Sequence, residues 1–211
     1  MKLRQAALSV AVALGLSACA FGHRYDYSDT GTSLAYRGQG RVAVAAWDQR
    51  PYVLSGNKDP HFVGLQRSLY GIPFNVSTDS GQPLATEMGK AMVLTLAGAG
   101  FGATPVELPA QDQQSQALQA LLQAGLRRSL LLRVDNWESD NYKNPTVTYD
   151  LSLAVYDHDG RRLASTGTKG IDDLHSKLFD SSTAPGKIVP ALFQQKIQQM
   201  LDAPEIQAAL R

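Results

Sequence analysis

The feature that most constrains the fold is the alternation of apolar and polar side chains over residues 146–156. One face of this run carries the apolar residues Val147, Tyr149, Leu151, Leu153 and Val155. The other face carries Thr146, Thr148, Asp150 and Ser152. Because successive residues of a strand point to opposite faces, the pattern predicts an antiparallel strand with one face buried and one in water.

The neighbouring segments extend this strand into a mixed sheet. Asp157-His158-Asp159-Gly160 predicts a hairpin turn, and Arg162–Gly170 a returning edge strand. Earlier apolar runs predict strands at Val42–Asp48, Thr104–Leu108 and Ser129–Trp137. Apolar stripes with helical spacing predict helices at Pro83–Ala99, Asp112–Ala124 and Ile188–Leu201.

The order of these elements, β-α-β-α-β-β-β-α, predicts a mixed α/β (α+β) fold. Strands joined by helices should be parallel with right-handed crossovers, and strands joined by tight turns should be antiparallel. The expected sheet has five strands in the order 2-1-3-4-5 and is covered by helices. We expect a single globular domain over residues 41–211, because a chain of 211 residues is typical of one domain.

The amino terminus has the pattern of a lipoprotein signal peptide. Lys2 and Arg4 precede a short apolar run, Ala6–Leu16, which is too short for a membrane-spanning helix. Leu16-Ser17-Ala18-Cys19 then resembles a lipobox, in which the cysteine thiol accepts diacylglycerol. We therefore expect residues 1–18 to be removed and Cys19, the single cysteine of the chain, to carry acyl chains that anchor the protein in a membrane.

Two further expectations follow for the amino-terminal region. In lipoproteins of the enteric type, Asp after the cysteine favours retention in the inner membrane, so Ala20 implies an outer-membrane protein facing the periplasm. Residues 19–40 show no sustained periodicity and many small polar residues, which predicts a flexible tether.

Charge argues against nucleic acid as a partner. The formal net charge is +1, and removal of Lys2 and Arg4 with the leader, which has no acidic residue, gives +1 − 2 = −1. A near-neutral domain lacks the basic surface that nucleic acid requires.

No motif for catalysis, a cofactor or a metal is present. The sequence has no G-x-S-x-G elbow, no H-E-x-x-H, no cysteine pair and no phosphate-binding loop. His175 with Asp172 and Asp173 predicts a solvated turn in preference to a metal site, and Asp135, Glu138 and Asp140 lack calcium-loop spacing. We expect a protein that is not an enzyme.

Residues 49–80 are predicted to form a long irregular loop that leaves the carboxyl end of the first strand, the usual ligand position in open α/β sheets. Aromatic and arginine side chains, which dominate binding hot spots, recur in it. The candidate binding residues are Asp48, Arg50, Tyr52, His61, Phe62, Arg67, Tyr70 and Phe74. An alternative is that these aromatic residues only pack the loop onto the domain.

Several short segments resemble the YajG-type family of bacterial lipoproteins. They are the lipobox at Cys19, Asp48-Gln49-Arg50, Gly100-Phe101, Asn141–Tyr149 and the tail Asp202-Ala203-Pro204-Glu205-Ile206. The predicted topology is also similar to that of auxiliary lipoproteins of periplasmic lipid-transport systems. Neither resemblance implies a catalytic residue, and the segment 51–80 is longer than the family pattern.

The sequence thus favours a non-enzymatic envelope module that binds a protein partner through exposed aromatic residues. One alternative is a small-molecule site for a lipid or a peptidoglycan fragment, with the same aromatics closed around a pocket. A second is a hydrolase that uses Asp48 beside His61 and Arg50.

Overall fold

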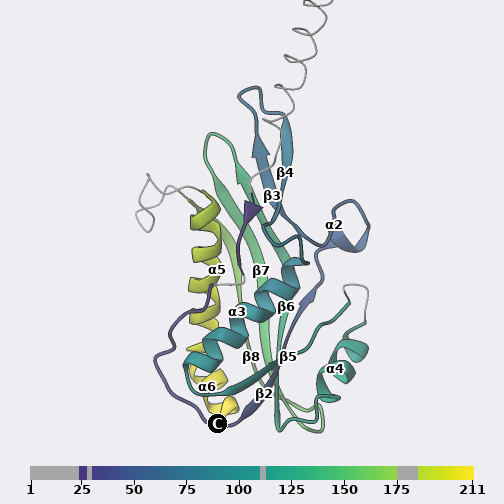
Figure 1. The fold of residues 1–211 in the computed structure, drawn as a ribbon, viewed down its shortest axis with the longest axis vertical. Helices are drawn as coiled ribbons and strands as arrows, with labels where there is room; N and C mark the ends of the chain where they lie inside the picture. Colours follow the sequence, from purple (N-terminus) through teal and green to yellow (C-terminus); the bar gives the residue numbers. More distant parts are fainter. Residues whose placement is uncertain (1–23, 28–29, 110–112, 175–184) are drawn as a thin grey trace, which may run out of the picture.

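The computed structural model describes residues 24–27, 30–109, 113–174 and 185–211 (Figure 1). Its strands are β1 (Arg24–Tyr25), β2 (Arg41–Asp48), β3 (Phe62–Arg67), β4 (Pro73–Thr78), β5 (Gly102–Pro105), β6 (Arg128–Asn141), β7 (Thr146–Asp157) and β8 (Arg162–Asp173). Its helices are α2 (Pro51–Leu54), α3 (Leu84–Gly98), α4 (Gln114–Leu122), α5 (Pro185–Leu201) and α6 (Pro204–Leu210). The expected mixed α+β class is confirmed.

The long strand β6 organises one mixed sheet. Antiparallel β7 pairs along one side of β6, and β8 pairs with β7. On its other side β6 has two parallel partners in succession: β2 pairs with Arg128–Val134, and β3 pairs with Ser139–Asn141. Beyond β2 lies β5, and beyond β3 lie β4 and then β1.

The predicted sheet of five strands in the order 2-1-3-4-5 is therefore wrong, because the described residues form a sheet of eight strands with a longer order. The pairings among β5, β2, β6, β7 and β8 have the expected neighbours and directions. The additional strands β1, β3 and β4 come from segments that sequence pattern assigned to a tether and a loop.

The irregular loop predicted at residues 49–80 is also wrong, since α2 and the antiparallel β3–β4 hairpin lie within it. Glycine at position 64 allows the hairpin to join the sheet. A Cβ atom on this residue would clash with Ser139, because it would lie 2.8 Å from the backbone nitrogen and closer still to both oxygens of that residue. Both strands are short, and Pro73 begins one of them, so neither has the alternation that identifies β7.

The flexible tether is wrong for the part of residues 19–40 that the structure describes. Tyr25 and Tyr27 are completely buried and Tyr36 is nearly so. The indole Nε1 of Trp137 donates to the Tyr27 hydroxyl over 2.9 Å, and the Asn141 amide donates to Tyr25. These aromatic side chains make the amino-terminal segment part of the core, because their buried area outweighs the local polar composition.

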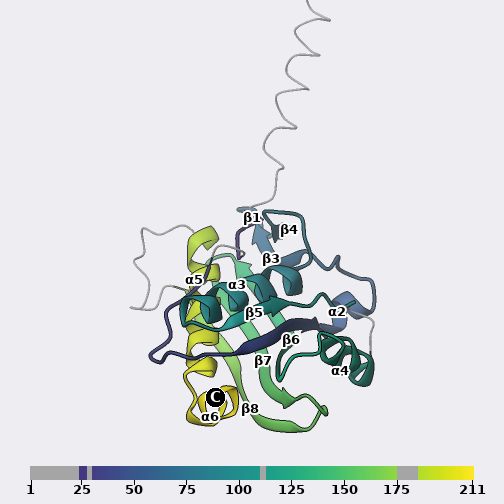
Figure 2. The same cartoon turned by 60° about the horizontal axis from the view of Figure 1, so that its bottom comes forward.

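Helices cover both faces of the sheet unequally (Figure 2). α3, α5 and α6 enclose the larger apolar core on one face, which includes Trp137 and Phe193. α4 covers a smaller cluster on the other face, around Trp47 and Leu121. Among the described helices, none combines the length and the hydropathy needed to cross a membrane.

Candidate functional site

The first candidate site residues, Asp48 and Arg50, form a buried ion pair at the carboxyl end of β2. Arg50 Nε donates to Asp48 Oδ1 over 2.8 Å, and Nη2 donates to Oδ2 over 2.7 Å. The guanidinium also donates to the carbonyl oxygens of Phe62, at 2.5 Å, and Pro60, at 3.0 Å. Since Arg50 is 0% exposed and Asp48 is 3% exposed, this buried pair joins β2 to the start of β3.

Tyr52 and Phe62 pack beside this ion pair. Their rings meet edge to face with centroids 5.6 Å apart, and Phe62 is 2% exposed. The Tyr52 hydroxyl donates to the backbone oxygen of Trp137 over 3.1 Å, and burial raises the pKa of Tyr52 to about 12. Both residues therefore pack this segment onto the domain, as the alternative interpretation of the aromatic residues expects.

Arg67 and Asp140 form a second, more exposed ion pair farther along the β3–β4 hairpin. Arg67 donates from Nε and Nη2 to the Asp140 carboxylate over 2.9 and 2.6 Å. This bidentate contact fixes the outer part of the hairpin to the carboxyl end of β6. His61 lies apart from it, and its half-exposed ring is 3.7 Å from Asp59.

Tyr70 and Phe74, by contrast, face solvent at the end of the hairpin, which projects from one end of the molecule (Figure 1). Tyr70 is 90% exposed and Phe74 is 45% exposed. Three further apolar side chains near them are exposed: Leu69, Ile72 and Tyr142. The Tyr142 hydroxyl reaches the turn, since it would lie 3.7 Å from a Cβ atom if Gly71 had one. We define the hairpin tip as Leu69, Tyr70, Ile72, Phe74 and Tyr142.

Sequence reasoning missed Leu69, Ile72 and Tyr142. A signal was available, since Leu69-Tyr70-Gly71-Ile72 places three large apolar residues around a glycine where a turn is normally polar. Gly71 has φ +82°, in the left-handed region that favours glycine. The turn is therefore a defined structure that presents apolar side chains to solvent.

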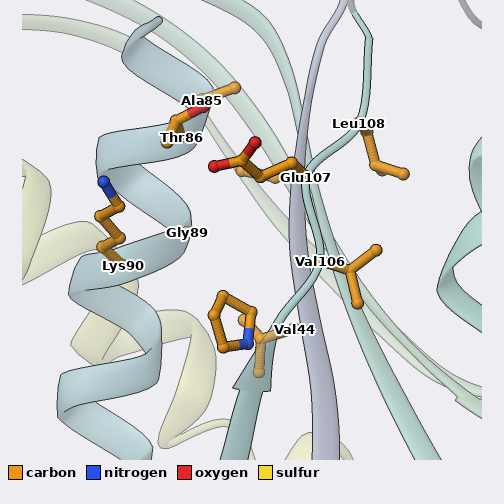
Figure 3. Close-up of a pocket in the computed structure, with 10 residues that line it drawn as sticks. Val44, Ala85, Thr86, Gly89, Lys90, Val106, Glu107 and Leu108 are labelled. Atoms are coloured by element: carbon orange, nitrogen blue, oxygen red, sulfur yellow. The ribbon is translucent and has the colours of Figure 1, made fainter. Parts of the chain in front are cut away.

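A groove lies between α3 and the segment that follows β5 (Figure 3). Its volume is about 260 Å³, and an adjoining groove of about 350 Å³ extends it to Asp48 and Pro60. Val44 and Pro105 line it, while Lys90, Thr86 and Glu107 supply polar groups. In Figure 3 the Glu107 carboxylate points toward α3. Sequence reasoning expected a ligand at this sheet edge but missed Lys90 and Glu107.

Acidic residues weighed above as metal ligands have other partners, and the part of the chain that the structure describes contains no group of three side chains suited to a metal ion. Asp172 accepts from Lys196 at 2.7 Å and from the Tyr149 hydroxyl at 3.0 Å. Asp140 is occupied by Arg67, and Asp135 by Arg133. His175 and Cys19 lie outside the described residues.

Comparison with known proteins leaves the family open. No protein-family model and no curated protein matches the sequence. Among solved structures, the fold is similar to XCC0632 from Xanthomonas campestris, a DUF330 protein, with 16% identity and a TM-score of 0.49 over 85% of this chain and 91% of that one. A PelC dodecamer from Paraburkholderia phytofirmans shares 14% identity, with a TM-score of 0.37 over 84% and 93% of the two chains.

Lipoprotein GNA1162 from Neisseria meningitidis shares 14% identity, with a TM-score of 0.33 over 77% of this chain and 97% of that one. These neighbours include a DUF330 protein and a lipoprotein, but no family match establishes the YajG-type resemblance. Similarities of this size carry no conclusion about what the chain binds.

Proposed function

We propose that this chain is an outer-membrane lipoprotein that is anchored through Cys19, faces the periplasm and serves the cell envelope as a non-enzymatic binding module. The observation that carries the anchor is the lipobox Leu16-Ser17-Ala18-Cys19 after a charged, then apolar, leader. Ala20, in place of an inner-membrane retention residue, supports the outer membrane.

The start of the described domain supports close attachment to the membrane. β1 begins at Arg24, which is 24 − 19 = 5 residues after Cys19, and pairs with β4. A fully extended chain spans at most about 3.6 Å per residue, so the lipid would lie within roughly 18 Å of Arg24. The domain would therefore rest against the bilayer and not at the end of a long tether.

The contacts at the carboxyl end of β2 support a role without catalysis. The Asp48 carboxylate is held on both oxygens by Arg50, and within the described part of the chain the His61 ring forms its ion pair with Asp59. A general base needs an oxygen or nitrogen within hydrogen-bond reach of its substrate. The hydrolase alternative would require this buried pair to open.

The exposed hairpin tip supports a binding role. Buried aromatic residues of the same segment have packing partners, whereas Tyr70 and Leu69 are about nine-tenths exposed. Exposed apolar clusters of this kind mark interaction sites. We propose that the tip, and not the earlier set around Asp48, is the binding surface of the module.

Replacement of the lipobox cysteine tests the anchor. We expect Cys19→Ala to move the protein from the membrane fraction to the soluble periplasmic fraction, or to leave it as an uncleaved precursor. Ala20→Asp is the matched variant, because it keeps the lipid and is expected to shift the protein to the inner membrane. Lipid-labelled, firmly membrane-bound Cys19→Ala protein would show that the anchor is wrong.

A second candidate function is binding of a small envelope molecule in the groove of Figure 3. The observation in its favour is position, since the groove lies at the carboxyl ends of parallel β2 and β5, beside the start of α3. Native mass spectrometry of the purified protein should then show a bound small mass that Thr86→Trp, which fills the groove, removes. Identical spectra of bare protein for both forms would count against it.

A further inference from the structure

We propose that the hairpin tip docks into the lipid surface of the membrane that holds Cys19, so that the domain contacts the bilayer at two points. This inference rests on the proposed lipid anchor and names the occupant of the binding surface. The occupant is the interfacial region of a phospholipid bilayer. The direction of β1, the composition of the tip and the rigidity of the hairpin support a bilayer at this position.

β1 lies beside β4, at the end of the molecule that carries the hairpin (Figure 2). β4 runs from Pro73, beside the tip, to Thr78, and β1 runs parallel to it with Arg24 opposite Ser77. The amino-terminal end of β1 therefore points toward the tip. Pro73 lies four residues from Ser77, roughly 13 Å along the strand. Five residues of chain, up to about 18 Å, allow Cys19 to reach the level of the tip.

The composition of the tip suits the boundary between water and acyl chains. Leu69 and Ile72 are aliphatic, while Tyr70 and Tyr142 combine an apolar ring with a hydroxyl, as in the aromatic belts of membrane proteins. The segments 66–75 and 141–145 contain Arg67 and Lys143 but no acidic residue. Asp140, the nearest carboxylate in the sequence, is paired with Arg67. Because Asp140 neutralises Arg67, Lys143 supplies the basic group beside the apolar side chains, and this combination favours a phospholipid surface.

The size of the tip distinguishes a bilayer from a protein partner. A stable protein interface uses about 20–30 residues on each side and roughly 800 Å² per partner. The tip offers a narrow turn with a few large apolar side chains, led by Leu69 at 92% and Tyr70 at 90% exposure. Shallow insertion of such a group by about 5–10 Å is typical of interfacial anchors.

The hairpin behind the tip is held rigidly. Arg50 binds the carbonyl oxygen of Phe62 at the start of β3, Gly64 pairs closely with Ser139, and Arg67 clamps Asp140. A rigid support keeps the apolar side chains from folding back onto the domain. The tip therefore stays exposed in the unbound protein and is ready for a membrane surface.

Depth-dependent quenching of an added tryptophan tests the proposal. The full-length lipidated protein is reconstituted into vesicles of phosphatidylethanolamine and phosphatidylglycerol whose acyl chains carry bromine. Tyr70→Trp reports from the tip, and His158→Trp, in the exposed β7–β8 turn, reports from the opposite end. Trp47 and Trp137 are buried and contribute the same background to both variants. We expect loss of the added emission for Tyr70→Trp only.

The outcomes separate the inference from the proposed function. Protein that does not remain with the vesicles contradicts the anchor itself. Protein that remains, with neither added tryptophan quenched, overturns the inference alone. Leu69→Ser with Ile72→Ser in the Tyr70→Trp background should weaken the quenching while circular dichroism shows an intact fold. A photoreactive residue at position 70 should yield lipid adducts in cells, and one recurring protein adduct instead would overturn the proposal.

Discussion

The base and the tip of the β3–β4 hairpin have similar compositions and opposite environments. At the base, Phe62 is 2% exposed, and Arg50, which precedes the hairpin in the sequence and binds the Phe62 carbonyl oxygen, is 0% exposed. At the tip, Leu69 is 92% exposed and Tyr70 is 90% exposed, although both belong to the same short hairpin as Phe62. Aromatic and arginine content alone therefore does not identify a binding surface, because the same residue types build a core contact and an exposed patch.

The difference arises from which partners the sheet brings near. Arg50 lies where β2, β3 and the preceding loop meet, so its donors are satisfied by Asp48 and by backbone oxygens of Pro60 and Phe62. The tip extends past the paired end of β6, where little chain remains to cover it (Figure 1). Breaking the base should thus alter stability, whereas changing the tip should alter only binding.

The largest expected effect comes from removing the charge partner at the base. Arg50→Ala leaves the Asp48 carboxylate buried without its cation and frees two backbone oxygens. We expect the free energy of unfolding to fall by about 3–5 kcal/mol, as for other broken buried pairs. Urea denaturation followed by circular dichroism measures this change.

Two controls sharpen this first prediction. Arg50→Lys keeps the positive charge but not the planar guanidinium that binds both carboxylate oxygens, so it should recover part of the lost stability. Arg67→Ala, in the more exposed pair with Asp140, should lower the stability much less. Equal losses of stability for Arg50→Ala and Arg67→Ala would contradict the expected difference between the buried ion pair at the base and the more exposed ion pair farther along the hairpin.

A matched pair of phenylalanines compares the two regions directly. Phe62→Ala removes a ring that packs on Tyr52 and is 2% exposed, so we expect a loss of roughly 3–5 kcal/mol. Phe74→Ala truncates a ring that is 45% exposed, and its effect should stay within about 0.5 kcal/mol. Thermal and urea unfolding of both variants give the comparison, and it fails if the two losses are similar.

The smallest expected effect concerns the pH dependence of stability that comes from Glu87, a carboxyl group outside the hairpin. Glu87 in the first turn of α3 accepts from the Tyr27 backbone nitrogen over 3.3 Å and from the Ser80 hydroxyl. Burial raises the pKa of Glu87 above its ordinary value of 4.5. Above pH 4.5 the folded state therefore binds more protons than the unfolded state, and the stability contributed by Glu87 is lost as the pH rises through the folded pKa.

Replacement by the neutral amide isolates this contribution. Glu87→Gln should flatten the decline of the urea midpoint with rising pH above 4.5, measured in steps up to pH 8. Glu138, whose pKa burial also raises, should keep its own share of the slope. If the urea midpoint of Glu87→Gln changed with pH as steeply as that of the unmodified protein, the Glu87 carboxyl group would not be the source of the pH dependence.

Strongly periodic segments made most of the fold predictable. The alternation in β7 and the turn after it gave the correct antiparallel partners, β6 and β8. The apolar stripe of α3 and the buried run of β2 were also recognised. These elements bury a whole face, so their sequence pattern follows from their geometry.

The short elements were not predictable for a physical reason. β1 has two residues, and β3 and β4 have six each, which is too few to show a period. Their hydrogen-bond partners come from residues far away in the sequence, such as Ser139 for Gly64. Hence the tether and the loop were assigned from local composition, and Tyr25 and Phe62 were found in the core.

The amino-acid sequence by itself determined the mixed sheet class and the main strand neighbours, because both rest on local pattern and spacing, and it is also the basis of the proposed lipid anchor at Cys19. Only the tertiary structure decided which of the candidate residues are buried. Arg50 and Tyr70 look alike as candidates in the sequence, yet one is enclosed by three chain segments and the other lies on a turn beyond the end of the sheet. Burial depends on contacts between distant segments, which no local pattern encodes.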